Sequence, residues 1–75
     1  MKVHVKTFGS LTDILEKEFE TSATDTADLL AALIAQHQEL ANRNLLIAVN
    51  NTVVHTAVEL KENDQVALMP PYSGG

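Results

Sequence analysis

One stretch of the sequence, from Thr26 to about Leu40, repeats its apolar residues with the period of an α-helix. On a helix these residues would form one apolar stripe, with Leu29 on its flank. The residues of the stripe are Leu30, Leu33, Ile34, His37 and Leu40. Thr26 or Asp25 can cap the helix, and Asp28 in the first turn suits the positive end of the helix dipole. Most of the remaining chain has the alternation or the short apolar runs of strands. The sequence therefore predicts a sheet packed on one main helix.

Two strands are expected before this helix. The segment from Val3 to Phe8 alternates, and its two faces are Val3, Val5 and Thr7 against His4, Lys6 and Phe8. Gly9 breaks the alternation, and Ser10 is the expected N-cap of a helical turn that pairs Leu11 with Ile14 and Leu15. The segment from Glu18 to Thr21 alternates again with Phe19 inward. We expect this second strand to pair antiparallel with the first.

Three strands are expected after the helix. The run Leu45–Val49 is nearly all apolar, as a central strand covered on both faces would be. Asn50 and Asn51 tolerate positive φ, which predicts a two-residue hairpin turn into residues 52–55. Residues 62–64 form a further turn before the last strand, Gln65 to Met69. The order predicts an α+β protein of the β-grasp fold, with a mixed sheet of about five strands packed on one main helix.

Composition and charge exclude several classes of protein. The 75 residues carry a net charge of −5 and are 45% hydrophobic, which is too apolar for a disordered chain. Without cysteine there is no disulfide, no thiolate nucleophile and no zinc site of the usual sulfur type. His4, His37 and His55 lack the spacing of metal ligands, so we expect no bound metal.

The distribution of basic and apolar residues bears on partners and location. Lysine and arginine are scattered singly, so we expect no nucleic-acid partner. The first eight residues lack the apolar run of a signal peptide, and no stretch is long enough to span a membrane. We therefore expect a cytoplasmic protein without a membrane partner.

The last six residues differ from the rest of the chain; they are Pro70, Pro71, Tyr72, Ser73, Gly74 and Gly75. The two prolines favour an extended segment, which predicts a β-grasp domain at 1–69 and an extended tail at 70–75 with a reach of about 20 Å. The bare backbone of the two glycines can enter a channel where any Cβ would clash. A C-terminal carboxylate is ionised at neutral pH and is a poor electrophile, so chemistry there requires activation by a second protein. The alternative is a frayed terminus, which is the usual fate of chain ends.

A set of apolar side chains is expected on the sheet face away from the helix, at the base of this tail. Strand alternation turns each of them away from the core positions of its own strand. The set is Phe8, Val53, Ala67 and Met69. Single exposed apolar residues need no explanation, whereas a contiguous patch is typical of a protein-contact surface. We therefore take these four as candidate partner-binding residues.

Three segments resemble the family of molybdopterin synthase small subunits. They are the run Leu46–Asn50, the turn at residues 63–64 before the last strand and, above all, the ending Pro-Pro-Tyr-Ser-Gly-Gly at residues 70–75. The start, from Phe8 to Asp13, is similar to that family's first strand and helix start. The resemblance implies a ubiquitin-like β-grasp fold and the role of a sulfur carrier that is not catalytic alone.

The same resemblance implies a reaction at Gly75. A ubiquitin-activating-type adenylyltransferase would use ATP to adenylate this residue, which is then converted to a thiocarboxylate. The tail would enter the large subunit of molybdopterin synthase, where the sulfur passes to a cyclic pyranopterin to build the dithiolene of the molybdenum cofactor. No cofactor would be bound by this chain itself, because the activating partner uses the ATP.

Three other assignments remain open from the sequence. The sulfur carrier of thiamine thiazole synthesis has a similar fold and also ends in Gly-Gly, although the preceding Pro-Pro-Tyr-Ser favours the molybdenum pathway. A ubiquitin-like modifier would instead join its terminal glycine to a lysine of a target protein. A plain interaction module would have an inert tail.

Overall fold

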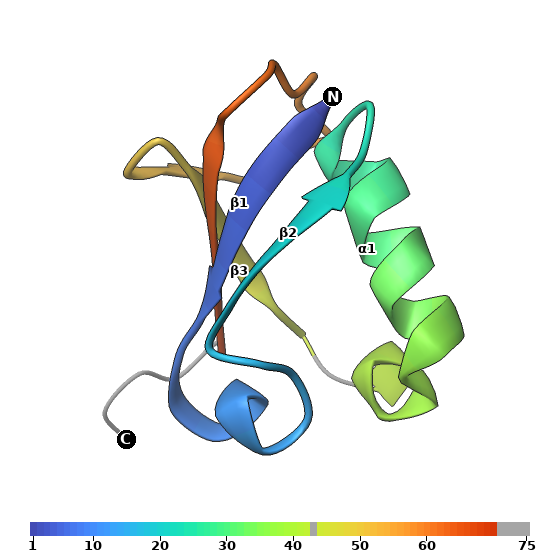
Figure 1. Ribbon diagram of the computed structural model, residues 1–75. Coiled ribbons are helices and arrows are strands. Elements are labelled where there is room, and N and C mark those ends of the chain that lie inside the picture. Colours follow the sequence, from blue (N-terminus) through green and yellow to red (C-terminus); the bar gives the residue numbers. More distant parts are fainter. Residues whose placement is uncertain (43, 71–75) are drawn as a thin grey trace.

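The structure, a computed structural model, describes residues 1–42 and 44–70 of the 75-residue chain. In this part of the chain a five-stranded mixed sheet packs on the α-helix α1 (Thr26–Gln36), which covers one face of the sheet (Figure 1). The strands are β1 (Lys2–Thr7), β2 (Glu18–Ser22), β3 (Leu46–Val49), β4 (Thr52–Val54) and β5 (Gln65–Met69). Two 3₁₀-helices, η1 (Gly9–Asp13) and η2 (Gln38–Asn42), follow β1 and α1. The predicted order of elements is confirmed.

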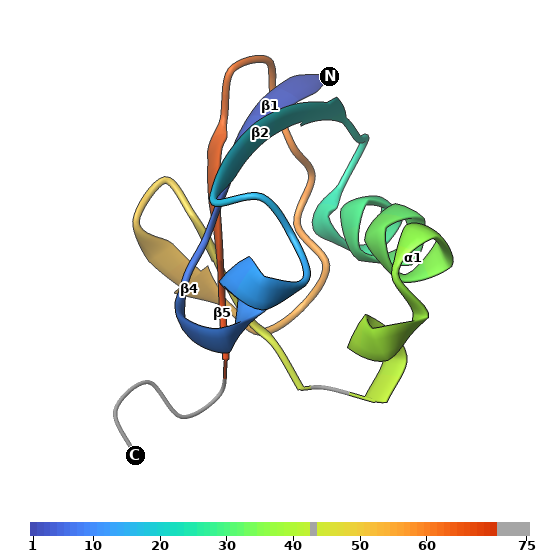
Figure 2. The ribbon, with the colours of Figure 1, turned by 60° about the horizontal axis from the view of Figure 1, so that its bottom comes forward.

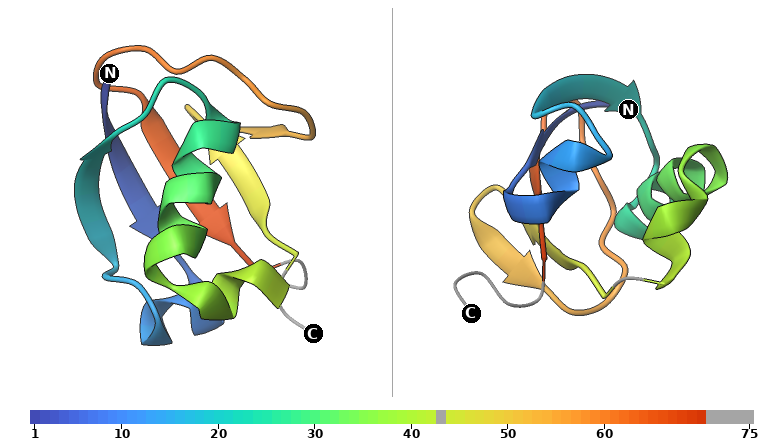
Figure 3. Two further views of the ribbon diagram at one scale, coloured as in Figure 1. Left: turned by 90° about the vertical axis from the view of Figure 1, so that its right-hand side faces the viewer. Right: turned by 90° about the horizontal axis from the view of Figure 1, so that it is seen from below.

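The strands lie in the order β2-β1-β5-β3-β4, so the last strand in sequence is the middle of the sheet (Figure 3). It pairs parallel with β1 and antiparallel with β3, and β1 pairs antiparallel with β2 as expected. The run Leu45–Val49 contains β3, which is an interior strand between β5 and β4 as predicted, while the middle place of the sheet belongs to β5. Its apolar run has the predicted cause: Ile47 and Ala48, on opposite faces, are both buried.

The core lies between the sheet and α1. Its fully buried large side chains are Val3, Val5, Leu11, Leu29, Leu40, Val66 and Leu68. Burying each such side chain stabilises the fold by about 1.5–3 kcal/mol before entropy is counted. Thr7, buried on the same face, donates its hydroxyl to the Glu16 carbonyl at 2.8 Å, so its polar group is satisfied. The predicted inward face of β1 is therefore confirmed.

Helix α1 begins where the sequence predicted and ends earlier. Asp25 is the N-cap, and its side chain accepts from the Asp28 backbone N–H at 2.7 Å. The expected continuation to Leu40 was wrong, because His37 leaves helical geometry with φ −134° and ψ 86° after its N–H bonds the Leu33 carbonyl. The 3₁₀-helix η2 then carries Leu40 into the core, where only 1% of it is exposed.

The turns are set by residues with positive φ. Asn50 and Asn51, with φ of 50° and 70°, connect β3 to β4 and confirm the predicted hairpin. The predicted cap at Ser10 was wrong: η1 begins at Gly9 with φ 61°, and extended Phe8, two residues before Ser10, occupies the cap position. This start places η1 beside the end of β5 (Figure 2). Among the described residues, no helix has the length and apolar character needed to cross a membrane.

Candidate functional site

The sheet face opposite α1, here called the outer face, has a fixed register of side chains. One row across four strands pairs Lys6 with Ala67, Ala67 with Ala48, and Ala48 with Val53. A second pair, Leu46 with Met69, lies next to it toward the end of β5. Paired residues of neighbouring strands share a face, so these side chains form one surface.

The part of the outer face over β5, β3 and β4 is apolar. Phe8 is extended, with φ −133° and ψ 160°, and donates its N–H to the Leu68 carbonyl at 3.1 Å, so it continues the alternation of β1 onto this face. Phe8 and Val53 are 46% and 44% exposed, whereas Ala67 and Met69 are half-buried. We call the set of Phe8, Leu46, Val53, Ala67 and Met69 the outer apolar patch. The four candidate binding residues therefore share one face, two of them less exposed than strand parity suggested.

A shallow hollow of about 400 Å³ opens beside this patch. The β3–β4 turn, the end of β1 and strand β5 form its walls, with Lys6, Phe8, Asn50, Asn51, Gln65, Val66 and Ala67 as lining residues. It is open to solvent and does not enclose a ligand as small-molecule pockets do.

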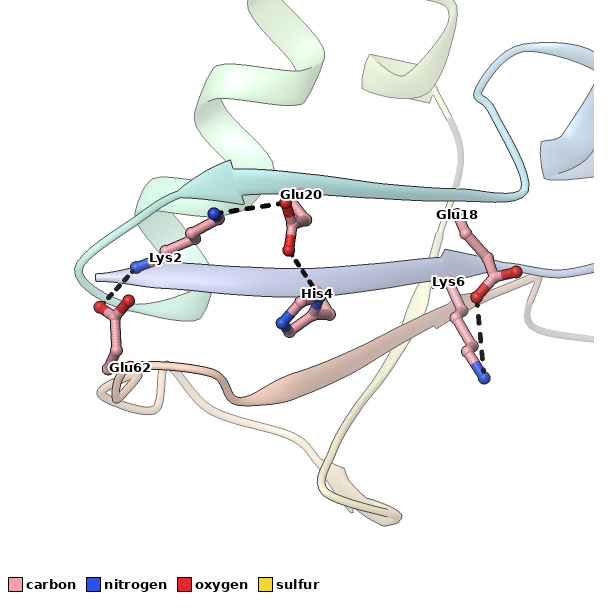
Figure 4. Close-up of polar contacts among 6 residues, drawn as sticks. All are labelled: Lys2, His4, Lys6, Glu18, Glu20 and Glu62. Carbon is pink, nitrogen blue, oxygen red and sulfur yellow. Dashed lines mark hydrogen bonds and ion pairs between the residues drawn. The ribbon is translucent and has the colours of Figure 1, made fainter.

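The other half of the outer face, over β1 and β2, is charged (Figure 4). Glu20 lies 3.4 Å from Lys2 Nζ and 3.1 Å from His4 Nδ1, and Glu18 lies 3.9 Å from Lys6 Nζ. The Lys2 backbone N–H also donates to Glu62 at 3.0 Å. Exposed ion pairs of this kind contribute at most about 1 kcal/mol each to the free energy of unfolding. We therefore regard them as the charged border of the apolar half of the outer face and not as a main source of stability.

Strand β5 is held at its start by Asp64. The Lys61 backbone N–H and the Asn50 side-chain amide donate to this carboxylate at 2.8 and 3.1 Å. These hydrogen bonds hold the pKa of Asp64 below its ordinary value of 3.8, and the bond from the Lys61 backbone has the larger effect. Asn50 also accepts from the Gln65 N–H at 3.0 Å, so the network joins the β3–β4 turn to the first residue of β5.

Pro70 is the one predicted tail residue that the structure describes. It is half-buried and directly follows β5, so the tail begins at the edge of the outer apolar patch. Pro71, Tyr72, Ser73, Gly74 and Gly75 lie outside the described residues, and the extended conformation predicted for them stays a prediction.

The three histidines are dispersed. His4 pairs with Glu20, His37 caps the end of α1, and His55 is exposed just after β4. Within residues 1–42 and 44–70, no group of three or more His, Asp or Glu side chains is close enough to hold a metal ion.

Comparison with known proteins adds an independent observation. The sequence profile of the ThiS family matches residues 5–75, which is nearly the whole chain. The chain belongs to the ThiS family. The molybdopterin synthase sulfur carrier subunit of Chlamydomonas reinhardtii is 38% identical over 65 residues, covering 80% of this chain and 78% of that one. The resemblance to molybdopterin synthase small subunits is therefore confirmed.

Solved structures of similar shape extend this ThiS-family relationship. Putative molybdopterin converting factor subunit 1 from Pyrococcus furiosus aligns with a TM-score of 0.85 at 26% identity, covering 95% of this chain and 98% of that chain. One chain of a complex of subunits 1 and 2 of molybdopterin-converting factor from Helicobacter pylori aligns with a TM-score of 0.76 at 29% identity, covering 100% of this chain and 100% of that chain. SAMP1 from Haloferax volcanii aligns at 0.80 with 20% identity over both full lengths, which shows the fold alone. The ubiquitin-like β-grasp fold is confirmed.

Two outer-face residues of this ThiS-family chain were missed from the sequence. Leu46 and Ala48 sit between the predicted residues of β5 and β4 and complete the apolar surface. An all-apolar strand has no period from which to assign faces, so Leu46 could be placed only once its pairing with Met69 was known.

Proposed function

We propose that this chain is the sulfur-carrying small subunit of a molybdopterin synthase. The observation that carries the proposal is the 38% identity to a subunit with that name, within a family match that extends through Gly75. The match to a chain of the Helicobacter pylori complex of subunits 1 and 2 supports a second, large subunit as partner. The proposal includes a folded domain at residues 1–69 and an extended tail at residues 70–75. It also places the protein in the cytoplasm.

The proposed chemistry takes place at Gly75, as the residue that carries the C-terminal carboxylate. A carboxylate oxygen attacks the α-phosphorus of ATP on an adenylyltransferase of the ubiquitin-activating type, and pyrophosphate leaves. Hydrosulfide released by a sulfur donor then adds to the acyl-adenylate carbonyl, and AMP leaves with one of the two original carboxylate oxygens. The resulting thiocarboxylate has a nucleophilic sulfur where the original group had only a weakly nucleophilic oxygen.

The large subunit would use this sulfur. In the proposal the outer apolar patch docks on that subunit while the tail enters its channel, and the sulfur passes to a cyclic pyranopterin. Binding away from the reacting atom holds the thiocarboxylate in register with its substrate, which is how remote contacts accelerate a reaction.

Deletion of Gly75 tests the proposal directly. The variant should fold as the parent does, since changes at exposed positions shift the free energy of unfolding by about 0.5 kcal/mol or less. It should not be adenylated, and a chain with one residue appended after Gly75 should be equally inactive because its carboxylate is out of register. Gly74→Val should be impaired because a β-branched side chain then stands where the channel admits only backbone.

The measurement is intact mass after incubation with ATP, a sulfur donor and the cognate activating enzyme. The parent chain should gain the mass of an oxygen-to-sulfur exchange, and none of the three variants should. Normal modification of the deletion or of the extension would overturn the sulfur-carrier assignment. A branched peptide joining Gly75 to a lysine would indicate a protein modifier instead, and transfer of the sulfur to a thiazole precursor would indicate the thiamine pathway.

A further inference from the structure

The first residue of the tail rests against a bare piece of backbone. Gly9, at φ 61°, begins η1, and its nearest non-neighbouring contact on the side where a Cβ would be is the ring of Pro70. A Cβ placed on Gly9 would lie 2.9 Å from Pro70 Cγ and 3.3 Å from Pro70 Cδ. Since Cβ atoms do not approach carbon closer than 3.0 Å, the pyrrolidine ring occupies the space that a side chain at residue 9 would need.

The backbone around Gly9 is held in place. On one side the Phe8 N–H donates to the Leu68 carbonyl at 3.1 Å, and on the other the Thr12 hydroxyl donates to the Gly9 carbonyl at 2.9 Å. Leu11, two residues on, is fully buried in the core. A side chain at residue 9 would therefore displace Pro70 more readily than it would displace η1.

We propose that Gly9 is a positioning residue for the tail: its missing side chain leaves a seat for the Pro70 ring, which sets the direction in which the chain leaves β5. Proline fixes its own φ, and a following proline confines the ψ of Pro70 to extended values, so the orientation of the Pro70 ring limits the direction of the next peptide. As a contribution to the reaction at Gly75, this role rests on the sulfur-carrier function proposed above. Through the extended tail that the two prolines predict, a displacement at its first residue would shift the carboxylate, and misplacement by about 1 Å can cost roughly a hundredfold in rate.

The test compares substitutions that share one kind of backbone strain. Gly9→Ala places a Cβ against Pro70 and also forces alanine into positive φ. Asn63→Ala imposes the same strain at φ 67° in the turn before β5, at the opposite end of the sheet from Pro70, and is the matched control. Gly9→Asn adds the same Cβ with a residue that tolerates positive φ, so it keeps the test open if Gly9→Ala folds poorly.

Adenylation of the full-length chain by its activating enzyme should separate these variants. Gly9→Ala and Gly9→Asn should lower kcat at least about tenfold. The KM should stay within about twofold, because neither substitution changes a side chain of the outer apolar patch. Asn63→Ala should keep the parental kcat. In a Pro70→Ala background, where the ring carbons are gone, adding Gly9→Ala should lower kcat no further.

A second readout does not depend on the reaction. Proton NMR of the parent chain and of Asn63→Ala should show a nuclear Overhauser effect between Gly9 Hα and the Pro70 ring, and both Gly9 variants should lose the corresponding contact. Absence of this nuclear Overhauser effect in the parent chain would overturn the proposed contact between Gly9 and the Pro70 ring. Gly9 variants with the kcat of Asn63→Ala overturn its positioning role. If the parent chain is never adenylated, the sulfur-carrier function fails, and the NMR result alone decides whether the seat exists.

Discussion

Asp64 carries a charge that hydrogen bonds from Lys61 and Asn50 stabilise in the folded chain. Its folded pKa lies below the ordinary 3.8, so its contribution to stability is complete above that pH and is lost as the pH falls through the lower, folded value. Asp64→Asn should therefore be less stable than the parent chain at neutral pH, and the difference should shrink below pH 3.8. Urea unfolding of both proteins between neutral pH and pH 2 measures this difference.

The matched control uses the residue that donates to the same carboxylate. In an Asn50→Ala background one of the two donors is absent, so Asp64→Asn should change the acid dependence less than it does in the parent chain. An equal change in both backgrounds would show that the Asn50 amide does not contribute to the shift.

The outer apolar patch gives a second prediction at this scale. Phe8→Asp and Val53→Asp each place a charge at a position that is nearly half exposed, so their effect on unfolding should be about 0.5 kcal/mol or less. Each should weaken binding to the large subunit at least about tenfold, since burying an apolar side chain contributes about 1.5–3 kcal/mol. Titration calorimetry with the purified large subunit provides the measurement.

Ala31→Asp is the control for these two substitutions. Ala31 is exposed on α1, on the opposite side of the sheet from the patch, and the substitution adds the same charge. It should leave the affinity unchanged. Parental affinity in Phe8→Asp and Val53→Asp would exclude the patch from the interface.

The turns could be predicted from residue types, whereas the contact between Gly9 and the Pro70 ring could not. Asn50 and Asn51 are recognisable because their side chains tolerate positive φ, a property of each residue alone. The fit of Gly9 to Pro70 joins residues at the two ends of the chain, and no local pattern reports a contact of that kind.

At the scale of elements, the start of α1 is fixed by two reciprocal contacts. Asp25 accepts from the Asp28 N–H, and Asp28 in turn accepts from the Thr24 N–H at 3.0 Å. Asp25→Ala should destabilise the protein by about 1 kcal/mol, because it leaves a helix N–H without its acceptor. Asp25→Asn retains an acceptor, so its loss of stability should be smaller than that of Asp25→Ala. Urea unfolding at neutral pH compares them, and equal losses would assign the effect to the negative charge near the helix dipole.

The ends of elements were harder to predict than the elements themselves. A helical period shows that Leu40 points inward, and η2 satisfies that requirement as well as a longer α1 would. The break at His37 therefore leaves no trace in the apolar pattern. At η1, the turn starts at the positive φ of Gly9, whereas preferences for capping side chains pointed to Ser10.

For the whole molecule, the net charge of −5 predicts assisted association with a basic groove on its partners. The association rate should fall as salt is raised, because exposed charges are screened over roughly 10 Å at 0.1 M ionic strength. Stopped-flow binding at several ionic strengths measures it. Glu39→Gln combined with Glu59→Gln removes two exposed negative charges and should flatten the dependence. A rate independent of salt in the parent chain would exclude electrostatic steering.

The overall architecture followed from the pattern of elements, and the lateral order of strands did not. Alternation assigns each strand its inner and outer residues, as in β1, where Val3, Val5 and Thr7 are all buried. It carries no information on which strands are neighbours. The all-apolar β3 and the alternating β5 are both paired on two sides, and nothing in the alternation of β5 showed that it holds the middle place.

The central place of β5 has a consequence for how the protein is made. Its two neighbours, β1 and β3, do not pair with each other, so the sheet stays in two separate halves until residues 65–69 are available. A nascent chain on the ribosome lacks this strand until synthesis is nearly finished, and its long-range pairing must wait. A prematurely terminated chain that stops before β5 would remain unfolded and open to proteolysis. Quality control would thus remove the copies that end short of the root of the tail.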